Sequence, residues 1–160
     1  MIYEDKTLAI NKPGECYIDL SDFNTAIKQA SLTDNKKEKI NFFKKAAELY
    51  SGNVLEGYYE SWCEELREQY REKFIAASEQ LILMLEERSL NEDLIQYTEK
   101  LLQYDRLNLS AFKSLIKHFI KTGNKAKALK SYEKFKKDYY SSFEENLPEK
   151  SVNEIEELFN

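Results

Sequence analysis

The chain has 160 residues, enough for one domain with its own hydrophobic core, and its two prolines and four glycines leave room for long helices. Hydrophobic residues make up 42% and charged residues 33%, a balance that is typical of globular proteins and too apolar for intrinsic disorder. The formal net charge of −5 argues against direct binding of DNA or RNA by this segment, because nucleic-acid affinity depends on lysine and arginine that neutralise phosphates.

The first twenty residues are predicted to form a short β-hairpin. Residues 7–10 (Thr-Leu-Ala-Ile) and 16–20 (Cys-Tyr-Ile-Asp-Leu) are β-prone, and the segment 11–15 between them contains the turn sequence Pro13-Gly14. A lone hairpin is marginal in water, so we expect this one to dock on other structure.

Residues 21–160 are predicted to be helical, because their apolar side chains recur with a helical period. The longest stripe predicts an amphipathic helix over residues 61–88, with Trp62 continuing the apolar stripe and therefore expected in the core. The fold class is therefore all-α, with about seven helices and a short N-terminal β-hairpin. The apolar stripes fall within residues 23–30, 40–50, 62–85, 94–102, 109–120, 128–139 and 152–159.

A repeat of 34 residues is visible in the second half of the chain. A shift by 34 places Leu81 on Leu115 and Leu85 on Phe119, and the same shift places Leu101 on Phe135. Two helices within a period of 34 residues are typical of tetratricopeptide units, which bury their apolar faces by stacking on one another. The alternative is an ordinary helical bundle in which this periodicity arises by chance.

Several motifs in linear order resemble the bacterial transcriptional activator domain (BTAD) of the antibiotic-regulator (SARP) type of transcription factor. The chain departs from the family at the repeat junction, where the family often has Asp-Pro and this sequence has Asp105-Arg106. The motifs are Tyr17-x-Asp19-x-x-x-Phe23, Leu49-Tyr50-x-Gly52-x-x-Leu55, Glu60-x-Trp62 at a helix start, and Gly123-x-x-x-x-Ala128-Leu129-x-x-Tyr132-Glu133.

The resemblance implies a regulatory protein-interaction module of a bacterial transcriptional activator. In such proteins a winged-helix DNA-binding domain precedes this domain, so residues 1–20 are expected to be a remnant of that domain or a link to it. Residues 21–160 are then the tetratricopeptide-like activator domain, and DNA is bound only through the upstream domain. Implied partners are another protein, a second subunit in a homodimer, or RNA polymerase. The alternative function is a free-standing tetratricopeptide adaptor that is not linked to DNA binding.

Two groups of residues are candidates for partner binding. Lys113, Lys117 and Lys121 are spaced by four along one helix face, which suits an acidic peptide or a carboxylate, although a solvated lysine stripe remains the alternative. Tyr58 and Tyr59 lie before the long predicted helix, where interface contacts and core packing remain equally open.

The sequence predicts no enzyme, no cofactor and no metal site. The only histidine, His118, has no recognisable catalytic partner, and the phosphate-binding, zinc and calcium motifs are missing. The two cysteines, Cys16 and Cys63, lack metal-ligand spacing, no signal peptide is recognisable, and no apolar run approaches the roughly 20 residues of a membrane span. We therefore expect a cytoplasmic protein without membrane contact.

Overall fold

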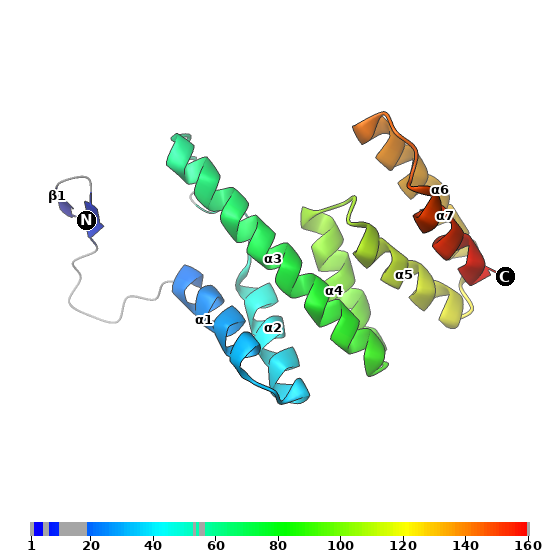
Figure 1. Ribbon diagram of the computed structural model, residues 1–160, viewed down its shortest axis with the longest axis horizontal. Helices are drawn as coiled ribbons and strands as arrows, with labels where there is room; N and C mark the ends of the chain where they lie inside the picture. Colours follow the sequence, from blue (N-terminus) through cyan, green and yellow to red (C-terminus); the bar gives the residue numbers. More distant parts are fainter. Residues whose placement is uncertain (1, 5–6, 10–18, 53, 55–56, 160) are drawn as a thin grey trace.

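The computed structural model describes residues 2–4, 7–9, 19–52, 54 and 57–159. These residues form seven α-helices, one 3-10 helix and two short strands, in the order shown in Figure 1. The prediction of about seven helices is confirmed. The elements are β1 (Ile2–Glu4), β2 (Thr7–Ala9), α1 (Asp19–Leu32), α2 (Lys36–Leu49), α3 (Ser61–Glu87), α4 (Asn91–Tyr104), α5 (Leu109–Lys121), α6 (Lys125–Phe143), α7 (Glu149–Glu156) and the 3-10 helix η1 (Glu157–Phe159).

The helices α1 to α6 pack as three consecutive hairpins. α1 packs with α2, α3 with α4 and α5 with α6, and each hairpin also contacts the next one along the chain. α3 is long enough to touch both neighbouring hairpins, since it contacts α2 as well as α5. Figure 1 shows the resulting row of helices, in which α7 folds back beside α6. This all-helical arrangement is consistent with the predicted tetratricopeptide-like array.

Two hydrophobic cores hold the array together. The first core joins α1 to α4, and its centre includes Tyr50 stacked on Phe74 with ring centroids 4.2 Å apart. The second core joins α5, α6 and α7, and its centre includes Phe112 stacked on Phe135 at 3.9 Å. Ile155 of α7 is fully buried in the second core, so the last helix covers apolar surface that α5 and α6 would otherwise expose.

The 34-residue register also describes the three-dimensional packing. Leu85 and Phe119 are both buried near the ends of α3 and α5, and Leu101 and Phe135 are both buried in α4 and α6. Residues at equivalent positions of two hairpins therefore face equivalent cores, as stacking units require.

The predicted N-terminal hairpin is not supported. β2 pairs antiparallel with β1, with Tyr3 opposite Leu8, and residues 16–18 of the expected second strand lie outside the described residues. Asp19 and Leu20, which were expected to end the second strand, begin α1, and the expected turn over residues 11–15 lies outside the described residues. Leu20 is helical because it packs on the first core one turn before Phe23, and this packing outweighs the β propensity of a short run.

Candidate functional site

The lysine stripe of Lys113, Lys117 and Lys121 lies on α5, a helix with one face in the second core and one polar face. Asn108 caps the start of this helix, because its side-chain oxygen accepts a hydrogen bond from the backbone N–H of Ala111 at 2.9 Å. The same side chain donates to Glu79 of α3 at 2.9 Å and so fixes α5 against the preceding hairpin. Phe112 and Ile116 then point into the second core, and the lysines occupy the polar side.

The three lysines have different surroundings. Lys113 pairs with Glu154 of α7, and Lys117 pairs with Glu86 of α3 with 2.9 Å between Nζ and Oε1. Lys121 contacts a neutral group, the hydroxyl of Ser89, at 3.5 Å. The stripe is therefore not a uniform cationic surface, since two of its three charges already meet carboxylates from other helices.

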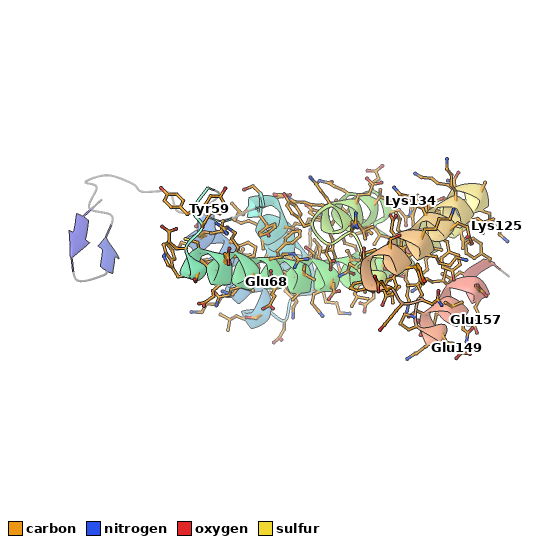
Figure 2. The ribbon with its side chains drawn as sticks, turned by 90° about the horizontal axis from the view of Figure 1, so that it is seen from above. Tyr59, Glu68, Lys125, Lys134, Glu149 and Glu157 are labelled. Atoms are coloured by element: carbon orange, nitrogen blue, oxygen red, sulfur yellow. The ribbon has the colours of Figure 1, made fainter. Side chains whose placement is uncertain are left out.

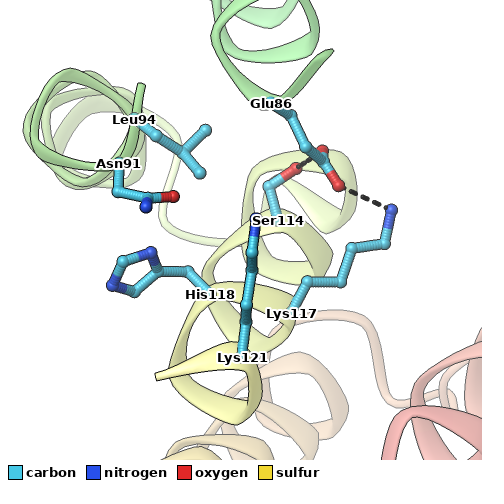
Figure 3. A pocket seen from close by; sticks show the side chains of 7 residues that line it. All are labelled: Glu86, Asn91, Leu94, Ser114, Lys117, His118 and Lys121. Carbon is cyan, nitrogen blue, oxygen red and sulfur yellow. Dashed lines mark hydrogen bonds and ion pairs between the residues drawn. The ribbon is translucent and has the colours of Figure 1, made fainter. Parts of the chain in front are cut away.

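A pocket of about 220 Å³ opens beside Lys117 and Lys121, where α5 meets the end of α3 and the start of α4 (Figure 3). Glu86 lies on its wall and accepts two interactions from α5, one from Lys117 and one from the hydroxyl of Ser114 at 3.0 Å. The lining residues are Glu86, Asn91, Leu94, Ser114, Lys117, His118 and Lys121. Lys113 does not line this pocket.

His118 is the titratable residue of the pocket that the sequence left without a role. Its Nδ1 atom is buried and has no hydrogen-bond partner among the described residues. Burial lowers the pKa of His118 below its ordinary value, and the nearby charges of Lys121 and Lys127 lower it further. These surroundings therefore favour the neutral form of the imidazole.

The second candidate group lies far from this pocket. Tyr58 and Tyr59 precede α3 and are exposed, and Tyr59 is labelled at the end of the molecule opposite Lys125 in Figure 2. Glu86 lies near the last residue of α3, and the 27 residues of this helix span roughly 40 Å at 1.5 Å per residue. The tyrosines and the lysines therefore do not form one site.

Trp62 corrects an expectation. It was expected in the core, but 54% of its surface is exposed, and the neighbouring Cys63 is fully buried in its place. Trp62 thus joins Tyr58 and Tyr59 in an exposed aromatic group at the start of α3.

Most lysines of the C-terminal region lie on α6 and most of its glutamates lie on α7 and η1. Lys125 and Lys134 lie on α6, and Glu149 and Glu157 lie on the adjacent segment, drawn below α6 at the same end of the molecule in Figure 2. The backbone oxygen of Phe159 accepts a hydrogen bond from Lys125 at 3.0 Å, which ties the two segments together.

Among the described residues, no group of three or more His, Cys, Asp and Glu side chains is placed to hold a metal ion. No helix in the described ranges combines the length and apolarity required to cross a bilayer.

Only the pocket residues on α5 could be found from spacing alone. Ser114, Lys117, His118 and Lys121 are separated by three, four and seven positions and so share one helix face. Glu86 and Asn91 belong to other helices, and only the fold brings them to this face.

Stacked helical hairpins with a polar pocket on one face define a helical-array domain. The family model of the bacterial transcriptional activator domain matches residues 18–142, and the chain belongs to this family. The resemblance inferred from the sequence motifs is thereby confirmed, and the domain is a transcriptional activator-type module. A search of curated proteins found no relative that matches the chain.

Proposed function

We propose that the chain is the regulatory protein-interaction module of a cytoplasmic bacterial transcriptional activator, and that DNA is bound by a domain outside this chain. Family membership carries this proposal. The net charge of −5 supports the division of labour, because an acidic module repels phosphates overall.

Several lysines are also neutralised by carboxylates on neighbouring helices, which further weakens attraction to DNA. Lys44 pairs with Asp93 at 2.6 Å, and Lys117 pairs with Glu86. Three lysines of α6, Lys130, Lys134 and Lys137, are exposed. They are the positions to vary in a DNA-binding test.

The test compares DNA binding by this chain with binding by the longer gene product that includes the upstream region. Fluorescence anisotropy with promoter DNA and with an unrelated duplex, at two salt concentrations, separates specific from non-specific binding. We expect specific binding by the longer protein alone. Specific binding by this chain that is lost in the triple variant Lys130→Gln, Lys134→Gln, Lys137→Gln would place DNA recognition on α6 and refute the proposal.

The partner side of the proposal is tested separately. The proposed partners are a second copy of the chain and RNA polymerase, bound through the α5 pocket or the aromatic group at the start of α3. Sedimentation at high concentration tests the homodimer, and co-purification with RNA polymerase tests the second partner. The double variants Tyr58→Ser, Tyr59→Ser and Lys117→Gln, Lys121→Gln distinguish the two surfaces, with Lys130→Gln as the control. If neither the homodimer nor the complex with RNA polymerase forms, the interaction role is wrong. If an association forms and neither double variant weakens it, only the choice of surfaces is wrong.

We further propose that the chain is not an enzyme. Acid–base or nucleophilic catalysis needs a base within hydrogen-bond reach of a reacting group. The Nδ1 of His118 has no such partner in the described part of the chain, and the Cys63 thiol is buried with its pKa raised by that burial and by Glu60.

A further inference from the structure

The three lysines of α5 differ in whether a carboxylate already neutralises them. Lys113 forms an ion pair with Glu154 of the chain's own α7, and Lys117 forms one with Glu86 of α3. Within the described residues, Lys121 has no carboxylate within 4.0 Å and contacts only the Ser89 hydroxyl at 3.5 Å. Two lysines of the stripe therefore already bind carboxylates, whereas the ammonium group of Lys121 at the pocket is available to bind another one.

The second unsatisfied group of the pocket is the imidazole of His118. Its Nδ1 has no hydrogen-bond partner within the described ranges, although an unpaired buried polar group normally costs folding free energy. No hydrogen bond from a described residue fixes the ring in one orientation, so either ring nitrogen can be assigned to face the pocket. Asn91 lines the same pocket with an amide group (Figure 3).

We propose that the pocket between α3, α4 and α5 binds a carboxylate from an acidic segment of a partner protein, and that this carboxylate sits between Lys121 and His118. Lys121 supplies the charge, and the imidazole and the Asn91 amide supply hydrogen-bond donors. The proposal rests on the interaction role proposed above and names the chemistry of the partner.

The size of the pocket supports a single side chain as its occupant. Its volume is about 220 Å³, below the roughly 300–1,000 Å³ of sites that enclose a drug-sized molecule. The ion pairs of Lys113 and Lys117 show that lysines on this face of α5 already bind glutamate side chains from neighbouring helices. A glutamate or aspartate from another chain would repeat this arrangement at Lys121.

Binding is expected to depend on pH through His118. The charged groups around the imidazole are Glu86 from α3, Lys117 and Lys121 from α5, and Lys127 from α6, while α4 adds the neutral Asn91 and Leu94. A carboxylate in the pocket offsets the repulsion from the lysines and stabilises the imidazolium. Affinity should therefore rise as the pH falls from 7.5 to 6, and the pKa of His118 should rise when the ligand is bound.

The experiment is an NMR titration of the complete chain, in which the imidazole C–H signals belong to one residue because His118 is the only histidine. The probe is the acidic peptide acetyl-Glu-Glu-Glu-Glu-amide, and acetyl-Gln-Gln-Gln-Gln-amide is its uncharged control. We expect saturable shifts of the His118 signals with the acidic peptide only. The substitution Lys121→Gln should weaken binding at least about tenfold, which corresponds to about 1.4 kcal/mol, whereas Lys130→Gln on exposed α6 should leave it unchanged.

Three outcomes would overturn the carboxylate assignment: no saturable shift, equal shifts with the glutamine peptide, or an equal affinity for Lys121→Gln. Inorganic phosphate at the same concentration is the final arm, and an equal response to it would show a general anion site instead. Unchanged folding of each variant is checked by circular dichroism. If partner association survives while the peptide fails to bind, only the carboxylate assignment is wrong. If the chain associates neither with a second copy of itself nor with RNA polymerase, the interaction role itself is wrong.

Discussion

The turns that close the hairpins α3/α4 and α5/α6 have the same geometry but different residues at one position. The backbone N–H of Leu90 bonds to the carbonyl of Leu85 at 3.1 Å, and 34 residues later that of Asn124 bonds to Phe119 at 2.7 Å. Between them, Ser89 has φ of 55° and Gly123 has φ of 78°, both in the left-handed region. This helix-ending motif favours glycine at that position.

We predict that glycine is more stabilising than alanine at both of these equivalent positions. A side chain in the left-handed region costs about 1–2 kcal/mol, and alanine recovers about 0.4–1 kcal/mol by restricting the unfolded chain relative to glycine. Gly123→Ala should therefore lower the free energy of unfolding by about 1 kcal/mol. No atom lies within 4 Å of the added Cβ, so the effect comes from the backbone and not from a clash.

At the first turn the comparison is between Ser89→Gly and Ser89→Ala. Both remove the hydroxyl that contacts Lys121, but only alanine keeps the Cβ in a strained conformation. The glycine variant should be more stable than the alanine variant by about 1 kcal/mol, which is a difference of about 2–4 °C in melting temperature for a chain of this size. Urea unfolding at equilibrium measures both differences. Equal stability of the glycine and alanine forms at both positions would refute the reasoning.

Three further predictions use the same unfolding assay. Thr98→Val should stabilise the protein by about 1 kcal/mol, because the fully buried hydroxyl of Thr98 has no hydrogen-bond partner in the part of the chain that the structure describes, and valine keeps its shape. A loss of stability would show that the hydroxyl is satisfied in solution. Ile155→Ala should cost about 2–5 kcal/mol, since Ile155 is fully buried, and a cost below 1 kcal/mol would show that α7 is not docked. Burial and the hydrogen bond to Glu48 raise the pKa of Tyr97. The neutral Tyr97 hydroxyl therefore contributes to the free energy of unfolding below about pH 10, and this contribution is lost as tyrosine ionises in the unfolded chain above that pH. Tyr97→Phe should make the fall in melting temperature between pH 9 and 11 shallower, and an unchanged slope would contradict this.

The helical elements could be predicted from periodicity, but the orientation of a helix end could not. Trp62, Leu66 and Tyr70 follow one helical spacing, and Cys63, Tyr70 and Phe74 follow another that fits equally well. Adjacent residues of a helix point about 100° apart, so only the packing of α3 on its neighbours decides between Trp62 and Cys63. At the chain start, the β propensity before residue 21 gave the wrong pairing because helix packing at Leu20 outweighs it.

The lysine face could be predicted from spacing, whereas its electrostatic state could not. Lys113 meets Glu154, which is 41 positions away, and Lys117 meets Glu86, which is 31 positions away. The spacing of four places the lysines together, and the stacking of α7 and α3 against α5 decides which of them keep an open charge. His118 could be placed on the same face, but its unpaired nitrogen follows only from the packed structure.

The C-terminal helix determines how much of this face remains for a partner. α7 lies beyond the residues that the family model matches, which end at residue 142. It buries Ile155 in the second core and places Glu154 on Lys113, so it partly covers the first lysine and neutralises its charge. The partner-binding surface proposed on α5 is thereby confined to the pocket at Lys117, His118 and Lys121. A substitution at Lys113 should consequently affect the docking of α7 more than it affects a ligand in that pocket.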